Sequence, residues 1–248
     1  MKYFLTAPIY YFNTLFSTIN NIYDKNFKQL QEKGFFVVEN FVEDYLCDNL
    51  RDKIDDLTTM GVFSWEDESK SDTRIFGVEK ALSDFNIFNE EINEQIVKKY
   101  IGKIKNSFVM ANRVLYKDHN LGSGGGWHRD SINRKQLKYI VYLNDVTSQN
   151  GCFQYLESTH KLSTKYKFNY KLNKNCSNTR FTDDEVDFLL KQFNLNLINF
   201  EAKKGTLIVI DTSGIHRGRP MERGVRYALT NYIFDSKLPL EIGKLLIK

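Results

Sequence analysis

Residues 124–145 read GGGWHRDSINRKQLKYIVYLND, and this stretch decides the fold class. It begins with glycines of a predicted loop, continues with a histidine and an aspartate two positions apart, and ends in a long apolar run. The run over residues 138–146 is rich in tyrosine, isoleucine and valine, which favour strands. Asn150-Gly151 then signals a tight turn into another strand over residues 152–156. The centre of the chain is therefore predicted to be β-structure.

Outward from this centre, the sequence predicts helices before it and strands after it. Apolar spacing favours helices, and β-rich runs bounded by turn residues favour strands. We predict a mainly β fold with packed helices (α+β), built on a double-stranded β-helix, or jelly roll, in one domain over residues 1–248. The predicted helices cover residues 26–33, 43–57 and 89–101, and the predicted strands cover 35–38, 107–116, 138–146, 152–156, 205–211 and 226–234.

Two segments lie outside this regular pattern. Residues 161–204 form an insertion between strands, with one helix opened by the capping box Thr182-x-x-Glu185. We expect this insertion and the loop 117–126 to shape a substrate pocket, because loops carry specificity. Residues 1–25 are predicted to form an amphipathic helix packed on the domain. Membrane contact through residues 3–23 is the less favoured alternative, because the polar face of that helix lacks lysine and arginine.

Composition restricts the class of partner. The formal net charge is +4, from 35 basic and 31 acidic residues, which suits an anionic ligand but not nucleic acid. The three cysteines are far apart, which predicts free thiols in a reducing compartment. We therefore expect a cytoplasmic protein that binds a small molecule, with no nucleic-acid partner.

The histidine–aspartate pair indicates a metal site. On extended backbone, His128 and Asp130 point to the same side. With the distant His216 they form a set of two histidines and one carboxylate, which is typical of non-haem Fe(II) oxygenases. An H-x-D pair alone is also compatible with a hydrogen-bonded surface pair. Arg226 strengthens the metal interpretation, because a guanidinium binds the far carboxylate of a 2-oxo diacid in a bidentate manner.

Several motifs together resemble the phytanoyl-CoA dioxygenase family. They are Gly124–Asp130, Leu137–Asp145, Asn150–Phe153 and Ser158–His160, with an opening strand at Gly34–Val38. The resemblance covers roughly residues 26–235. It implies that His128, Asp130 and His216 bind Fe(II), that Arg226 grips the 5-carboxylate of 2-oxoglutarate, and that O2 is the oxidant. Asn112, Tyr116 and Tyr139 are weaker candidates for contacts with the cosubstrate.

Departures from the family pattern bear on the substrate. Arg129 stands where glutamine is frequent, residues 157–159 read EST in place of proline, glycine and serine, and Gly218 replaces a serine. These differences argue against phytanoyl-CoA itself as the substrate. Asp130 argues against the family's halogenases, in which a halide replaces the carboxylate.

The substrate candidates are Trp127, Lys165, Tyr166 and Arg180, with core packing as the alternative for Trp127. Arg129 is predicted to form a salt bridge, and His160 is predicted to close a turn. The predicted function is a dioxygenase that hydroxylates a C–H bond of a small metabolite or biosynthetic intermediate, which is sugar-, lipid- or acyl-linked. The alternatives are a cupin-like metalloenzyme without redox chemistry and a non-catalytic jelly-roll binding module.

Overall fold

The computed structural model describes residues 24–88, 91–131, 134–175 and 177–247. A helix over residues 24–33 precedes the first strand. The other helices are α2 (Asp44–Thr59), α3 (Val78–Ala81), α4 (Glu91–Ile101), α5 (Leu162–Lys171), α6 (Asp183–Phe193) and α7 (Leu240–Leu245). The strands are β1 (Phe35–Val38), β2 (Trp65–Glu66), β3 (Asp72–Phe76), β4 (Asn106–Leu115), β5 (Leu137–Tyr142), β6 (Phe153–Leu156), β7 (Leu197–Phe200), β8 (Leu207–Asp211), β9 (His216–Gly218) and β10 (Val225–Phe234).

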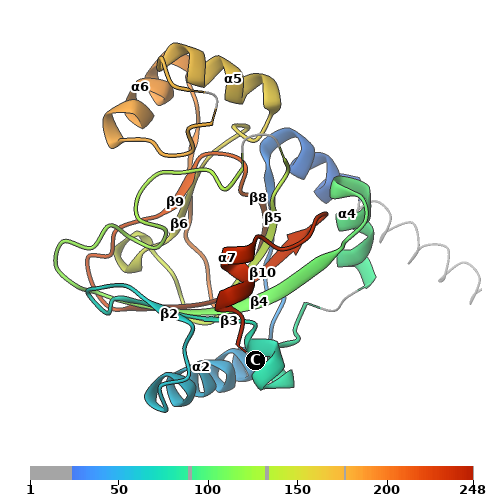
Figure 1. Ribbon diagram of the computed structural model, residues 1–248, viewed down its shortest axis with the longest axis vertical. Coiled ribbons are helices and arrows are strands. Elements are labelled where there is room, and N and C mark those ends of the chain that lie inside the picture. Colours follow the sequence, from blue (N-terminus) through green and yellow to red (C-terminus); the bar gives the residue numbers. More distant parts are fainter. Residues whose placement is uncertain (1–23, 89–90, 132–133, 176, 248) are drawn as a thin grey trace, which may run out of the picture.

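The strands form two antiparallel sheets. The larger sheet has the order β1-β8-β5-β10-β4-β3-β2, and the smaller has the order β7-β6-β9. Strands distant in sequence are neighbours in both sheets, as a jelly roll requires. In Figure 1, α2 lies below the large sheet, and α5 and α6 lie together at the opposite end of the molecule. The predicted jelly-roll core with packed helices is confirmed.

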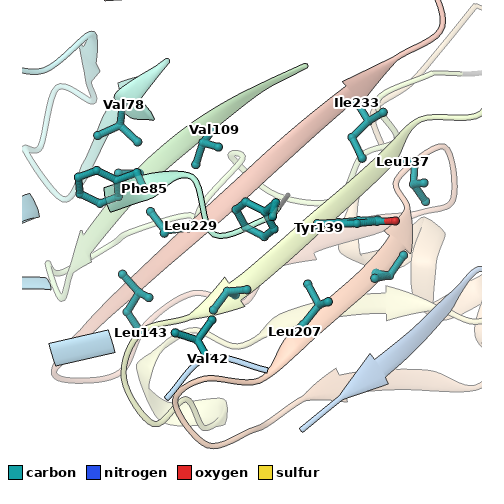
Figure 2. Packing of buried hydrophobic residues seen from close by; sticks show 14 of the residues in the cluster. Val42, Val78, Phe85, Val109, Leu137, Tyr139, Leu143, Leu207, Leu229 and Ile233 are labelled. Atoms are coloured by element: carbon teal, nitrogen blue, oxygen red, sulfur yellow. The ribbon is translucent and has the colours of Figure 1, made fainter. Parts of the chain in front are cut away.

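The two faces of the large sheet bury different cores, because successive residues of a strand point to opposite sides. On β5, Leu137, Tyr139 and Val141 belong to the core under the helices, with Leu50 and Ile54 of α2. Figure 2 shows this face, with Leu137, Tyr139, Leu207, Leu229 and Ile233 among its side chains.

The alternate residues of β5 face the small sheet. Ile140 and Tyr142 join Tyr155 of β6 and Phe200 of β7 in a second core between the sheets. The Tyr142 hydroxyl also accepts a hydrogen bond from the Phe153 N–H at 2.9 Å, which ties the two sheets together. Lys138 is the exception, since it places a charge on this inner face, where it lines a cavity.

Residues 161–204 are only partly an insertion. The capping box predicted for α6 is present, with the Glu185 N–H donating to Thr182 Oγ1 at 3.2 Å and the Thr182 N–H donating to Glu185 Oε2 at 2.8 Å. However, β7 belongs to the barrel, because Leu197 to Phe200 pair with β6. β7 has only four residues, and their exposure alternates. So short a pattern does not distinguish a strand from a continuation of the preceding helical segment in the sequence.

Several other expectations are resolved by the structure. Cys47 and Cys152 are free, buried thiols as predicted, and burial raises the pKa of each to about 11.

The prediction for residues 1–25 falls almost entirely outside the described residues. Within the described part of the chain, no helix has the length and apolar character needed to cross a bilayer. The β2–β3 hairpin, which the sequence did not predict, extends the large sheet beyond β4.

Gly34 generates a stability prediction. It ends the helix over residues 24–33 at φ +92°, and a Cβ there would collide with the Tyr155 hydroxyl and, at 2.6 Å, with His160 Nδ1. Gly61 has φ +75° but nothing within 4 Å of an added Cβ. We expect Gly61→Ala to cost about 1 kcal/mol from backbone strain alone. Gly34→Ala should cost about 2 kcal/mol more, because it adds overpacking.

Urea denaturation of both variants measures the difference in the free energy of unfolding. Equal losses in the two variants would contradict the packing assigned to Gly34.

Candidate metal centre

Two distant segments meet at the proposed metal site through backbone hydrogen bonds. The His128 N–H donates to His216 O at 2.9 Å, and the His216 N–H donates to His128 O at 2.8 Å. A further hydrogen bond nearby joins the same two segments, from the Asp130 N–H to Thr212 O at 2.9 Å. This antiparallel pairing places His128 opposite His216 and carries Asp130 to the same side as His128.

The three side chains form a compact donor set. One ligand atom from each of His128, Asp130 and His216 can be chosen so that all lie within 4.8 Å of one another. His128 Nε2 lies 3.6 Å from Asp130 Oδ1, and His216 Nε2 lies 3.9 Å from Asp130 Oδ2. The His216 side chain is 3% exposed and that of Asp130 is 24% exposed, so the site is deep on one side and open on the other.

The second nitrogen of each imidazole fixes its orientation. Nδ1 of His128 lies 2.9 Å from Gly126 O, and Nδ1 of His216 lies 3.0 Å from Gly214 O. A carbonyl only accepts, so each Nδ1 carries the proton and donates it. Each Nε2 is left with a lone pair facing Asp130, and this is how histidine ligands are commonly held in metal sites.

The electrostatics keep these donors in their ligand forms. Burial and the neighbouring His128 lower the pKa of His216 to about 3, and burial lowers the pKa of His128. Burial opposes ionisation of Asp130, but Lys138, His216 and His128 outweigh it and hold its pKa well below the usual range. Two neutral imidazoles and one carboxylate, all facing one point, fit a divalent metal such as Fe(II).

A buried carboxylate shapes the loop that carries His216. Asp211, at the end of β8, accepts hydrogen bonds from the Tyr100 hydroxyl at 2.8 Å and from the N–H groups of Gln136 at 3.1 Å and Ser213 at 2.9 Å. These bonds fix the turn between β8 and β9. Sequence reasoning treated Asp211 only as a strand end, because nothing local in the sequence marks its partners.

The cavity beside the donor set lies between the two sheets and has a volume of about 90 Å³. Arg226 is buried there, and it donates to Gly151 O and, at 3.3 Å, to Asn112 Oδ1. Asn112 in turn donates to Asp72 Oδ1 at 2.6 Å. Arg226 and Asn112 thus lie in the cavity, where they were expected to contact a cosubstrate.

Two further cations line the same cavity and were missed from the sequence. Arg74 of β3 makes a double hydrogen bond to Asp72, at 3.0 and 2.6 Å, and Lys138 Nζ lies 2.6 Å from Asp130 Oδ2. The signal for Lys138 was available, since it is the only charge in the apolar run LKYIVY. Arg74 had no such signal, because the strand that carries it was not predicted.

A second, wider groove opens next to this cavity. It shares Arg74, Gly124 and His128 with the cavity, and it is bounded by the β2–β3 hairpin, by the loop 119–125 and by Arg180. Arg180 donates to Gly124 O at 2.6 Å and to Gly125 O at 3.1 Å, so it also holds the glycine-rich loop. Of the four substrate candidates, Arg180 alone lines this groove.

Two cosubstrate candidates lie away from the cavity. Tyr139 points to the helix-covered face, where its ring lies 6.4 Å from that of Phe88, because β5 alternates and its even-numbered residues face the cavity. Tyr116 follows the end of β4, is 42% exposed and donates its hydroxyl proton to Asp118. Neither Tyr116 nor Tyr139 lines the cavity that contains Arg226.

Three substrate candidates are likewise elsewhere. Trp127 is buried in the core formed with α5 and α6, under the guanidinium of Arg217, which confirms its alternative packing role. Lys165 lines a different cavity, with His160 and Asp211. Tyr166 is 49% exposed on α5. No residue of α5 lines the groove, and α5 lies at the opposite end of the molecule from α2 (Figure 1).

Arg129 and His160 were assigned structural roles. The predicted salt bridge of Arg129 is absent among the described residues; its buried guanidinium lies 4.9 Å from the ring centroid of Phe181. A side chain between two donors points to the opposite side of the strand, here into the insertion core. His160 Nε2 lies 3.1 Å from Gln31 O, which agrees with a structural histidine.

Gly124 generates a prediction for the metal centre. Its φ is +91°, and an added Cβ would lie 2.6 Å from His128 Cε1, whereas at Gly102, with φ +89°, it would meet nothing within 4 Å. Gly124→Ala should displace the imidazole and weaken divalent-metal binding about 10- to 100-fold, as changes behind a ligand do. Gly102→Ala carries the same backbone strain and should bind metal nearly as the wild type does.

Isothermal titration with Mn(II) measures both affinities. Tight binding by the Gly124→Ala variant would mean that His128 is not a ligand.

Comparison with known proteins places this site in a family. The model of the phytanoyl-CoA dioxygenase (PhyH) family matches residues 30–222. No curated protein matches the sequence. Among solved structures, the epimerase SnoN in complex with Fe3+, alpha ketoglutarate and nogalamycin RO is similar, with a TM-score of 0.65, 11% identity, and coverage of 91% of this chain and 90% of that chain.

Two further solved structures share the fold. HygX from Streptomyces hygroscopicus, with nickel, 2-oxoglutarate and hygromycin B bound, has a TM-score of 0.56 at 13% identity and covers 85% of this chain and 87% of its own. The alpha ketoglutarate dependent carbocyclase SnoK has a TM-score of 0.54 at 12% identity, with coverage of 84% and 83%. The family match spans most of the chain and includes all three donors, His128, Asp130 and His216. The chain belongs to the phytanoyl-CoA dioxygenase family.

Proposed function

We propose that this protein is an Fe(II)- and 2-oxoglutarate-dependent oxygenase. His128, Asp130 and His216 would hold the iron, and Arg226 would bind the 5-carboxylate of 2-oxoglutarate. The observation that carries the proposal is the buried guanidinium of Arg226 in the cavity that the donor set lines. Structures of the same fold hold alpha ketoglutarate or 2-oxoglutarate together with a metal, which supports the assignment.

The charges in the cavity single out Arg226 for the cosubstrate. Arg74 is paired with Asp72, and Lys138 is paired with Asp130. Among the described residues, Arg226 has no carboxylate within 4.0 Å, and its Nε has no hydrogen-bond partner. A buried guanidinium that bonds only neutral acceptors retains much of its desolvation cost, and a bidentate carboxylate would offset it.

When bound, Fe(II) together with 2-oxoglutarate and O2 supplies the oxidising chemistry, which the side chains themselves lack. The residues of the chain position and shield that chemistry. Both imidazoles are locked by backbone carbonyls, so they need no reorganisation to bind a metal. The apolar side chains that line the cavity would limit the access of water to a bound cosubstrate. They are Met110, Ile140, Phe153 and Ala228.

We propose that the groove beside His128 receives the substrate and that the product is a hydroxylated C–H bond. The walls of the groove include the polar side chains of Asp67, Glu68, Ser69 and Arg180. These side chains favour a small, oxygen-rich metabolite over a long acyl chain, because polar groups that meet an alkyl chain lose their hydrogen bonds. SnoN and SnoK are an epimerase and a carbocyclase, so product analysis must test for hydroxylation directly.

The two alternative functions fit the site less well. A cupin-like metalloenzyme without redox chemistry has no need of a buried arginine beside the metal. A non-catalytic binding module has no need of three aligned donors with fixed tautomers. We also propose a cytoplasmic location, in keeping with the two free thiols.

Turnover of the cosubstrate tests the reaction class. Purified protein supplied with Fe(II), ascorbate and 2-oxoglutarate should form succinate slowly without substrate. Asp130→Ala removes one of three ligands and should abolish this activity. Succinate is measured by NMR or by liquid chromatography. Equal turnover by the Asp130→Ala variant would refute the iron assignment.

Binding of the cosubstrate tests Arg226. Arg226→Met should raise the Kd for 2-oxoglutarate at least about thirtyfold, since loss of a buried charge-assisted pair costs about 2 kcal/mol or more. Arg223→Met removes an exposed arginine three residues away and serves as the control. Titration of Mn(II)-loaded protein gives both values. Similar losses in the two variants would mean that Arg226 does not hold the cosubstrate.

A further inference from the structure

Lys138 is an unusual residue for the interior of a jelly roll. It lies in the middle of the large sheet, where β5 pairs with Tyr232 of β10 on one side and Ile210 of β8 on the other. Its side chain is 10% exposed. A lysine buried between two sheets costs free energy unless an anion accompanies it, so its partner indicates its role.

The partner is Asp130 of the metal site. Lys138 Nζ lies 2.6 Å from Asp130 Oδ2, and 4.2 Å from the ring centroid of Tyr232. A hydrogen bond this short between an amine and a carboxylate is charge-assisted, so the pair is ionic.

This contact makes the two oxygens of Asp130 unequal. Oδ1 lies 3.6 Å from His128 Nε2 and Oδ2 lies 3.9 Å from His216 Nε2, but Oδ2 alone also accepts the short hydrogen bond from Lys138. A carboxylate that binds a metal through both oxygens fills two coordination positions. With three protein donors, a cosubstrate that chelates the metal through two atoms, and O2, an iron site has room for only one oxygen from the aspartate.

We propose that Lys138 is a positioning residue that holds Asp130 to a single metal–oxygen bond and adds a fixed positive charge for the acidic cosubstrate. This inference rests on the proposed function and deepens it. The same ammonium would repel the divalent metal and attract the 2-oxoglutarate dianion, because both would bind beside Asp130. Removing the charge must therefore move the two affinities in opposite directions, which no loss of folding can do.

The experiment compares Lys138→Met, Lys138→Arg and the exposed control Lys191→Met by calorimetric titration under anaerobic conditions. Mn(II) is titrated first, and 2-oxoglutarate is then titrated into the Mn(II)-loaded protein. We expect Lys138→Met to bind Mn(II) about tenfold more tightly and 2-oxoglutarate about tenfold more weakly. A tenfold change is about 1.4 kcal/mol, near the lower end of a charge-assisted hydrogen bond. Lys138→Arg keeps the charge and should recover most of the 2-oxoglutarate affinity.

The outcomes separate the two levels of inference. If the Lys138→Met variant binds both Mn(II) and 2-oxoglutarate more weakly, or if neither affinity changes, the role assigned to Lys138 is overturned while the proposed function stands. A wild-type protein that binds neither Mn(II) nor 2-oxoglutarate would overturn the proposed function, and this inference with it. Parallel thermal denaturation shows whether each variant is folded at the temperature of the titration.

Discussion

The pair of backbone hydrogen bonds between His128 and His216 is the constraint on which the site depends. These residues are 88 positions apart, yet their N–H and C=O groups pair reciprocally at 2.9 and 2.8 Å. The pairing fixes the distance between the two imidazoles before any metal binds. It also brings the segment with Asp130 alongside Thr212. Without this ladder, three donors on two flexible loops would have to be ordered at the expense of metal affinity.

Electrostatic pairing assigns a different role to each cation in the cavity. Arg74 is paired with Asp72, and Lys138 is paired with Asp130. Arg226 bonds to an amide and a carbonyl oxygen, which leaves its full charge for a ligand. The large sheet thus places three cations in one cavity, and they differ in whether a carboxylate already pairs with them. The partner of each arginine distinguishes one with a structural role from one that can bind a ligand.

The failures of sequence reasoning have a common physical origin. Tyr139 and Lys138 are neighbours on one strand, so one must face the helices when the other faces the cavity. Choosing between them requires knowledge of which face of the sheet the helices cover, and a run of six buried residues does not encode it. Tyr166 and Lys165 were chosen because their segment seemed close to the barrel mouth, but α5 packs at the far end of the molecule.

The sequence by itself determined the donor types, the arginine and the β-rich core, because each depends on residue identity and local spacing. An H-x-D motif on extended backbone, a β-rich run and a capping box are properties of a few consecutive residues. Only the tertiary structure decided that Lys138 meets Asp130, that the β2–β3 hairpin bounds the groove and that Trp127 is core. Those contacts depend on strand order and on which face each strand presents, and both are set by packing across the whole sheet.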